Sequence, residues 1–275
     1  MNTPYGLKTK IFADGADLAS LQELVQHNWI AGFTTNPTLM RQAGVRNYEA
    51  FAREAIALVG GRPISFEVFS DDFAEMHQQA LHMASWGENV NVKIPVTNTK
   101  GESSAPLLKA LAAQGVKMNV TALMTLGQVK SSAAALAGAP ASFVSVFAGR
   151  IADTGRNPLP VMKEAMKILR PYPHLQLIWA SPRELLNLVQ ADATGCHIIT
   201  VTENLLKRLP FLGKDLDEFS LDTVRMFYND ALSAGFQLEL KTNESIRNLA
   251  DTLGPAAPVE MGEVASTEEV PVRNR

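Results

Sequence analysis

Residues 91–96, with the sequence NVKIPV, form a short β-branched run with one lysine, Lys93, in its interior. Such runs are typical of strands buried on both faces, where a charged side chain is costly to hold. Burial disfavours the ammonium form, so Lys93 is a candidate amine nucleophile for attack on a ketone and formation of a Schiff base. A lysine at a strand end can instead extend its ammonium to solvent, and Lys93 alone does not decide between these two interpretations.

Around this run, short apolar segments alternate with longer segments whose apolar residues recur at a spacing of three and four. The strand candidates are residues 8–14, 30–36, 63–69, 90–95, 117–122, 142–148, 175–181 and 197–202. The helical segments include residues 18–27, 48–59, 73–86, 105–114, 126–136, 160–169 and 183–189. Eight strand–helix units without a break in composition predict an α/β fold, a single (β/α)8 TIM barrel. The competing doubly wound sheet would need a glycine-rich turn after the first strand, and residues 14–17 (DGAD) are not one.

The C-terminal part has a different pattern. Residues 221–236 have the apolar spacing of a terminal helix. One arrangement that the sequence allows places this helix across the barrel mouth. We therefore expect a catalytic barrel domain over residues 1–253, including these C-terminal helices. Residues 254–275 are small, acidic and proline-containing, which predicts a mobile tail whose role the sequence does not show.

Composition limits the classes of partner. The chain has 275 residues, a formal net charge of −3 and no dense Lys/Arg stripe, so nucleic acid is not an expected partner. No apolar run reaches the roughly 18 residues of a membrane span, and the first ten residues lack the apolar core of a secretory signal. We expect a cytoplasmic protein without a membrane partner. A homo-oligomer is compatible with the sequence, which does not set the oligomeric state.

Cysteine and histidine usage argues against a metal centre. The single cysteine, Cys196, excludes a disulfide framework and is expected to pack as a small hydrophobe. The five histidines fall on predicted helices or at strand starts, so no three of them are expected to meet at the barrel mouth. We therefore expect no metal and no cofactor.

Barrel enzymes carry their chemistry at the carboxyl ends of the strands, and polar side chains fall there on the first seven predicted strands. They are Asp14, Thr34, Thr35, Asn36, Glu67, Lys93, Asn119, Thr121, Ser145, Arg150, Ser181 and Arg183. Some have simple structural alternatives, since Asp14 or Ser181 could cap a helix and Asn36 could set a turn before proline. Their recurrence around one buried lysine favours a single site.

The motifs resemble the transaldolase family, which includes the smaller fructose 6-phosphate aldolases. The similarity extends from about residue 8 to about residue 236 and depends on the segments TTNP at 34–37, VKIPVT at 92–97, NVT at 119–121, FAGR at 147–150 and ASPR at 180–183. It implies a metal-free mechanism in which Lys93 forms a Schiff base with a ketose phosphate. A dihydroxyacetone unit would then pass to an aldose phosphate, as in metabolism of the pentose phosphate type.

The resemblance also implies roles for the site residues. Lys93 would be the nucleophile and electron sink, and Glu67 would act as acid and base through a water positioned with Thr121. Asp14 would exchange a proton with the C4 hydroxyl of the sugar. The groups implied to bind the donor are Thr34, Asn36, Asn119 and Ser145 for its hydroxyls, and Arg150, Ser181 and Arg183 for its phosphate.

Two positions favour a transferase over an aldolase. The aldolase subgroup has glutamine where this chain has Glu67, and an acid/base tyrosine where this chain has Phe147. The resemblance implies that Phe147 is a substrate-binding position. An aldolase must protonate the enamine at carbon, and a phenylalanine supplies no proton. Departures from the family pattern are modest, such as Val146 where many members have proline. The alternatives are an aldolase-like lyase and a non-catalytic barrel that binds sugar phosphates.

Overall fold

The computed structural model describes residues 3, 5–238 and 253. These residues belong to two compact units, one ending at Leu209 and the other beginning at Pro210, and each is described by itself. The predicted tail at 254–275 lies outside the described residues, and the predicted domain boundary at residue 253 stays a prediction.

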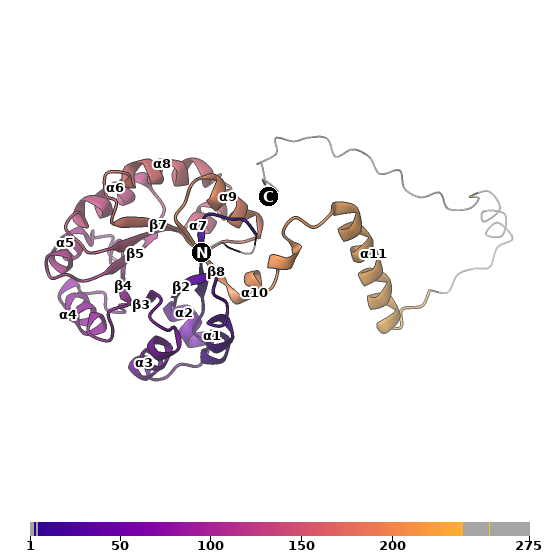
Figure 1. Cartoon of the computed structure of the whole chain (residues 1–275), viewed down its shortest axis with the longest axis horizontal. Helices are drawn as coiled ribbons and strands as arrows, with labels where there is room; N and C mark the ends of the chain where they lie inside the picture. Colours follow the sequence, from indigo (N-terminus) through magenta and orange to yellow (C-terminus); the bar gives the residue numbers. More distant parts are fainter. Residues whose placement is uncertain (1–2, 4, 239–252, 254–275) are drawn as a thin grey trace. The chain divides into compact units, whose positions relative to one another are not determined.

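The first unit is a closed barrel of eight parallel strands in sequence order, with β1 paired to β8 (Figure 1). The strands are β1 (Lys10–Asp14), β2 (Ile30–Thr34), β3 (Ile64–Glu67), β4 (Val90–Pro95), β5 (Met118–Leu123), β6 (Ser142–Val146), β7 (Leu175–Trp179) and β8 (Ile198–Thr202). The TIM-barrel prediction is confirmed. Several strands, among them β2, β3, β6 and β7, end two residues earlier than predicted.

Helices alternate with the strands and surround the barrel in Figure 1. They are α1 (Leu18–Leu24), α2 (Pro37–Gln42), α3 (Tyr48–Leu58), α4 (Phe73–Ala84), α5 (Ala105–Ala113), α6 (Leu126–Ala135), α7 (Ala148–Ala152), α8 (Leu159–Leu169), α9 (Leu186–Ala193) and α10 (Glu203–Leu206), followed by the 3-10 helix η1 (Leu209–Phe211). The short helices α2, α7 and α10 were not predicted, because four to six residues are too few to show a helical period. Two of them, α2 and α7, directly follow strands that carry site residues.

The barrel interior is apolar in its middle. Phe12, Phe143, Ile178, Ala180 and Ile198 form a separate buried cluster there, and the rings of Phe12 and Phe143 meet edge to face at 5.6 Å. Gly32 makes room for this filling, since a Cβ on Gly32 would lie 2.6 Å from Cζ of Phe12. The packed middle leaves the carboxyl ends of the strands as the place where polar side chains gather.

A close backbone contact joins the ends of β6 and β7. The carbonyl of Ser181 approaches Gly149 in α7 so closely that a Cβ there would lie 1.6 Å from the oxygen. Ser181 has a φ of 57°, a left-handed conformation that is costly for a residue with a side chain. Glycine at position 149 therefore allows the two loops that carry Arg150 and Arg183 to approach each other.

The second unit contains α11 (Leu216–Ser233), which Asp215 caps by accepting a hydrogen bond from the amide of Glu218. It begins before the predicted start at residue 221, because that prediction used the apolar spacing and not the cap. Its apolar side chains are exposed within the described residues, among them Phe227 and Leu232.

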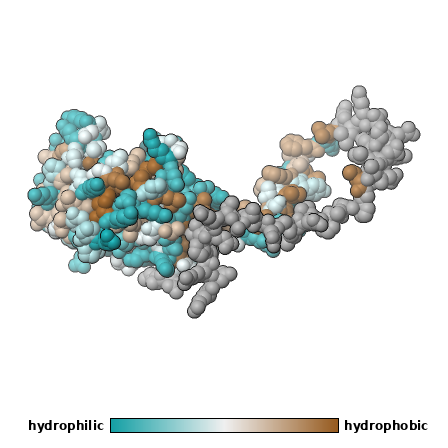
Figure 2. All heavy atoms as spheres, turned by 90° about the horizontal axis from the view of Figure 1, so that it is seen from above, coloured by the Kyte–Doolittle hydropathy of each residue, from teal (hydrophilic) through white to brown (hydrophobic). Residues whose placement is uncertain are grey.

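Figure 2 shows that the barrel surface in view is mainly hydrophilic or neutral with small hydrophobic patches. No helix among the described residues is both long and apolar enough to cross a bilayer.

Candidate active site

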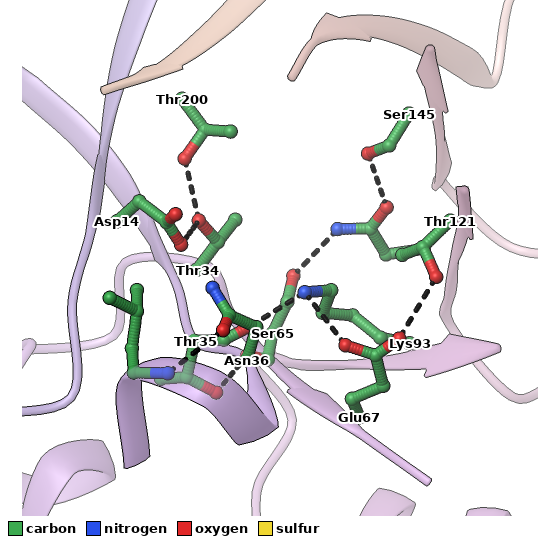
Figure 3. A network of polar contacts seen from close by, with 12 residues as sticks. Asp14, Thr34, Thr35, Asn36, Ser65, Glu67, Lys93, Thr121, Ser145 and Thr200 are labelled. Carbon is green, nitrogen blue, oxygen red and sulfur yellow. Dashed lines mark hydrogen bonds and ion pairs between the residues drawn. The ribbon is translucent and has the colours of Figure 1, made fainter. Parts of the chain in front are cut away.

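Lys93 lies in β4 with its side chain inside the barrel and only 7% of its surface exposed. Its Nζ is 3.1 Å from Oε2 of Glu67 and donates a hydrogen bond of 2.6 Å to the carbonyl of Thr35 (Figure 3). A buried ammonium is tolerated only when it is paired and hydrogen-bonded, and these two partners meet that requirement. The lysine does not extend to solvent, so the alternative that the sequence left open is wrong.

Glu67 closes β3 and lies opposite Lys93 in the parallel register. Its second carboxylate oxygen, Oε1, accepts a hydrogen bond of 3.1 Å from Thr121 on β5. The carboxylate therefore lies between the amine and a hydroxyl. This arrangement can move a proton to or from a group bound at Nζ.

Asp14 occupies the end of β1 and is half-buried. Thr34 on β2 donates a 2.7 Å hydrogen bond to its carboxylate, and the Thr34 hydroxyl lies 2.5 Å from that of Thr200 on β8 (Figure 3). Burial raises the pKa of Asp14 above its ordinary value, while the nearby charge of Lys93 and the bond from Thr34 act in the opposite direction. The raised pKa suits a group that exchanges protons.

Three buried polar groups form a chain across the other side of the barrel. Ser145 on β6 donates a 2.7 Å bond to Oδ1 of Asn119 on β5. Asn119 in turn donates a 3.1 Å bond to the hydroxyl of Ser65 on β3. These bonds fix the amide of Asn119 in one orientation, which is what a hydroxyl-binding group requires.

Asn36 also has a structural role, which is a helix cap and not only the turn before proline that the sequence suggested. Its Oδ1 accepts a 2.9 Å hydrogen bond from the amide of Leu39 and caps α2, which begins at Pro37. The cap engages the amide oxygen, while the amide nitrogen keeps its capacity to donate.

The predicted phosphate-binding groups lie apart from this central network. Arg150 is exposed on α7, and Ser181 and Arg183 follow β7. Arg183 donates from Nε to Asp153 at 2.9 Å and forms an ion pair with the same carboxylate. This pairing lowers the pKa of Asp153 and raises the pKa of Arg183. The guanidinium is thus already engaged by an anion in the forked geometry that suits phosphate.

Phe147 occupies the position before α7 and packs, partly buried, against the interior cluster that contains Phe143. Its ring presents no group that can donate a proton. The distinction from an acid/base tyrosine at this position stays a prediction.

Four residues that the sequence did not single out take part. Thr200 and Ser65 lie on predicted strands, and the alternation of inward-facing positions could have found them. Tyr48 bonds to the main chain of Glu67, and Asp153 pairs with Arg183. No local pattern identifies these last two, because each meets its partner only after the chain has folded.

Two cavities lie at opposite ends of the strands. One of about 350 Å³ lies beside Asp14 and is lined by residues of α1, α2 and α10. The larger, of about 560 Å³, is lined by Asn91, Lys117 and Phe143, at the opposite end of the strands from Lys93. Within the described residues, no group of three His, Cys, Asp or Glu side chains lies close enough to hold a metal ion.

Together, a closed barrel with a lysine, two carboxylates and several hydroxyl and amide groups at one mouth defines a protein of the TIM-barrel enzyme class. Comparison with known proteins narrows the class. Residues 11–252 match the family described as transaldolase/fructose-6-phosphate aldolase. The chain belongs to this family, and family membership supports an enzymatic role.

Several curated relatives have similar sequences. A probable transaldolase of Dehalococcoides mccartyi is 33% identical over 217 residues, which cover 78% of this chain and 97% of the relative. Probable transaldolase 2 of Listeria monocytogenes is also 33% identical, over 78% of this chain and 95% of the relative. A probable transaldolase of Caldicellulosiruptor saccharolyticus is 34% identical over 73% of this chain and 88% of the relative.

The environment of Asp14 predicts how stability changes with pH. Because the pKa of Asp14 is raised in the folded state, its contribution to stability is present below its ordinary value of 3.8 and is lost as the pH rises through the raised value. Asp14→Asn cannot titrate. We expect the free energy of unfolding of the variant, relative to that of wild type, to increase as the pH rises above about 4 in urea titrations. Asp217→Asn, on exposed α11, is the control, and an equal response of the two variants would contradict the prediction.

Proposed function

We propose that this protein is a transaldolase, which transfers a dihydroxyacetone unit from a ketose phosphate, such as fructose 6-phosphate or sedoheptulose 7-phosphate, to an aldose phosphate. It would act in carbohydrate metabolism of the pentose phosphate type. The observation that carries the proposal is the buried Lys93, whose Nζ is 3.1 Å from a carboxylate oxygen of Glu67. A buried amine beside a proton acceptor is the arrangement that a Schiff base needs.

The first step is attack of the Lys93 amine on the C2 carbonyl of the ketose. The amine becomes free to attack when the Lys93 ammonium gives a proton to Glu67. After the attack, a proton moves from nitrogen to the former carbonyl oxygen to form the carbinolamine, and Glu67 returns its proton to the new hydroxyl, which leaves as water. Thr121 holds the carboxylate by a hydrogen bond to Oε1, so that Oε2 stays directed at Nζ. The product is a protonated imine, which can accept an electron pair.

Carbon–carbon cleavage follows at the other carboxylate. Asp14 accepts the proton of the C4 hydroxyl, the C3–C4 bond breaks, and its electron pair passes into the imine to give an enamine. The aldehyde fragment leaves. When an acceptor aldehyde arrives, C3 of the enamine attacks it and Asp14 returns the proton to the new hydroxyl. Hydrolysis of the imine, with Glu67 as acid and base, releases the product.

Hydroxyls and phosphate of the substrate have separate binding groups. We assign the carbon chain to Thr34, Asn36, Asn119 and Ser145. We assign the phosphate to Arg150 and Arg183 with Ser181, where Arg183 must exchange the carboxylate of Asp153 for phosphate oxygens. Such an exchange replaces one anion by another in the same forked geometry, and phosphate carries the greater charge.

The enamine must survive until the acceptor arrives. Phe147 supports transfer over release, because its ring cannot protonate the enamine carbon. The carboxylate of Glu67 also favours transfer over release in this proposal, because the aldolase subgroup has a glutamine at this position.

Covalent trapping tests the proposal directly. Incubation with fructose 6-phosphate and borohydride should reduce the imine to a stable amine, and peptide mass spectrometry should find a dihydroxyacetone-sized adduct on Lys93. Lys93→Ala should lose both the adduct and turnover. Lys117→Ala, at the other end of the strands, is the matched control and should keep both. Turnover by Lys93→Ala, or an adduct elsewhere only, would refute the Schiff-base mechanism.

Arg183→Ala tests the phosphate site. Loss of a charge-assisted contact should raise KM for phosphorylated donors by about tenfold or more and leave kcat and unphosphorylated donors little changed. Arg170→Ala removes an exposed arginine at the end of α8 and is the control. Steady-state kinetics with fructose 6-phosphate and with dihydroxyacetone decide the matter, and equal losses on both kinds of donor would show that Arg183 does not hold phosphate.

Phe147→Tyr tests the basis for transfer. A phenol at this position should raise the release of free dihydroxyacetone relative to transfer, by about tenfold or more if it acts as a general acid. The ratio is measured by coupled assays with and without an acceptor aldehyde. Phe211→Tyr, exposed in η1, is the control, and an unchanged ratio in Phe147→Tyr would contradict the role given to Phe147.

A further inference from the structure

The hydrogen-bond ladder between β2 and β3 stops where the site begins. Phe33 donates its amide to Pro63 and Thr35 donates its amide to Ser65, at 2.8 and 3.1 Å. In a parallel ladder of this register, the next bonds would run from the amide of Glu67 to the carbonyl of Thr35 and from the amide of residue 37 to the carbonyl of Glu67. Both would fix the main chain of the residue that carries the carboxylate.

Neither of these bonds is formed. Residue 37 is Pro37, which has no amide hydrogen to donate. The carbonyl of Thr35 accepts from Nζ of Lys93 instead, at 2.6 Å. The main-chain groups of Glu67 on this side therefore need another partner, because unpaired buried peptide groups are costly.

The hydroxyl of Tyr48 supplies both missing bonds. It donates to the carbonyl of Glu67 at 2.8 Å and accepts from the amide of Glu67 at 2.9 Å. One phenol thus replaces a carbonyl acceptor and an amide donor of the absent strand continuation. The pKa of Tyr48 is raised, chiefly by burial, so the hydroxyl keeps the proton that it donates.

The ring of Tyr48 is held firmly enough to serve as such a partner. Tyr48 is the first residue of α3, which Asn47 caps through the amide of Ala50. Its ring centroid lies 6.4 Å from that of Phe66 and 6.1 Å from that of Trp86. The hydroxyl is therefore positioned by the helix start and by aromatic packing behind β3.

We propose that Tyr48 is a positioning residue of the active site, which replaces the strand β2 beside Glu67 and thereby leaves the Thr35 carbonyl available to Lys93. It touches no reacting atom. It acts through Glu67, whose carboxylate faces Nζ, and through Thr35, whose carbonyl orients Nζ from the other side. Its catalytic consequence rests on the proposed function, whereas its effect on the environment of Lys93 does not.

Tyr48→Phe keeps the ring and removes both bonds. The freed amide of Glu67 then competes with Lys93 for the Thr35 carbonyl, and the carboxylate loses its fixed anchor. We expect kcat to fall about tenfold or more, with KM for the donor changed less than threefold, because orientation of reacting groups is lost and substrate contacts are kept. Tyr172→Phe removes a partly buried phenol near His174 and is the matched control.

A second readout does not need turnover. Reductive methylation with formaldehyde and borohydride, followed by peptide mass spectrometry, reports the reactivity of Lys93 as a function of pH. The charged side chains that face Lys93 are Glu67 from β3 and Asp14 from β1, and both remain in the variant. Loss of the Thr35 acceptor should shift the Lys93 profile to lower pH in Tyr48→Phe, while exposed lysines such as Lys167 keep their profile.

The outcomes separate this inference from the proposed function. If wild type forms no dihydroxyacetone adduct but Tyr48→Phe shifts the methylation profile, the proposed function is wrong and the positioning role stands. If the wild-type protein forms the adduct, and the Tyr48→Phe variant has the same kcat and the same methylation profile as wild type, the positioning role is wrong. If Tyr48→Phe does not fold by circular dichroism, 3-fluorotyrosine at position 48 keeps the ring and hydroxyl with a weaker acceptor. It should give a smaller shift in the same direction, and an unchanged profile would overturn the inference.

Discussion

The ion pair between Lys93 and Glu67 is the interaction on which the rest of the site depends. A buried ammonium is stable only if its partners compensate for the lost solvation, and the barrel supplies a carboxylate from β3 and a carbonyl from the end of β2. Each of these partners is itself held, Glu67 by Thr121 and by Tyr48, and Thr35 by the ladder to Ser65. The polar centre is therefore a connected set of bonds in which the lysine is the common member.

Barrel closure explains why residues distant in sequence can form this set. Parallel strands in sequential order place all their carboxyl ends at one mouth, and the apolar cluster around Phe12 and Phe143 fills the middle below it. Thr34 and Thr200 illustrate this where β8 pairs with β1 and closes the barrel. The hydroxyl of Thr200 on β8 lies beside the hydroxyl of Thr34, which donates a hydrogen bond to Asp14. The raised pKa of Asp14 indicates that the site holds a carboxylate at some cost to stability, which is common where proton transfer is required.

The arginine region follows a different principle. Asp153 occupies Arg183 at the rim, where both side chains are partly exposed, so the ion pair contributes little to stability and can be exchanged. The close approach of Gly149 and the Ser181 carbonyl fixes the backbones that carry the two arginines, even though their side chains are exposed. Closely packed backbones with exchangeable side-chain partners would suit the proposed binding and release of a phosphate.

The sequence by itself determined the TIM-barrel class, the strand order and most of the groups at the mouth, because period-two and helical spacing, together with polar residues at strand ends, are local properties. Lys93, Glu67, Thr121 and Asp14 were all predicted from such positions, and the structure places them at the same mouth of the barrel, although their catalytic roles stay predictions. Only the tertiary structure decided that Tyr48 completes the ladder beside Glu67, that Asp153 engages Arg183, and that Thr200 joins Thr34. These contacts join elements that become neighbours only when the barrel closes and its loops fold. The spacing of residues along the chain does not show which side chain will bond to a peptide group that the neighbouring strand leaves unpaired.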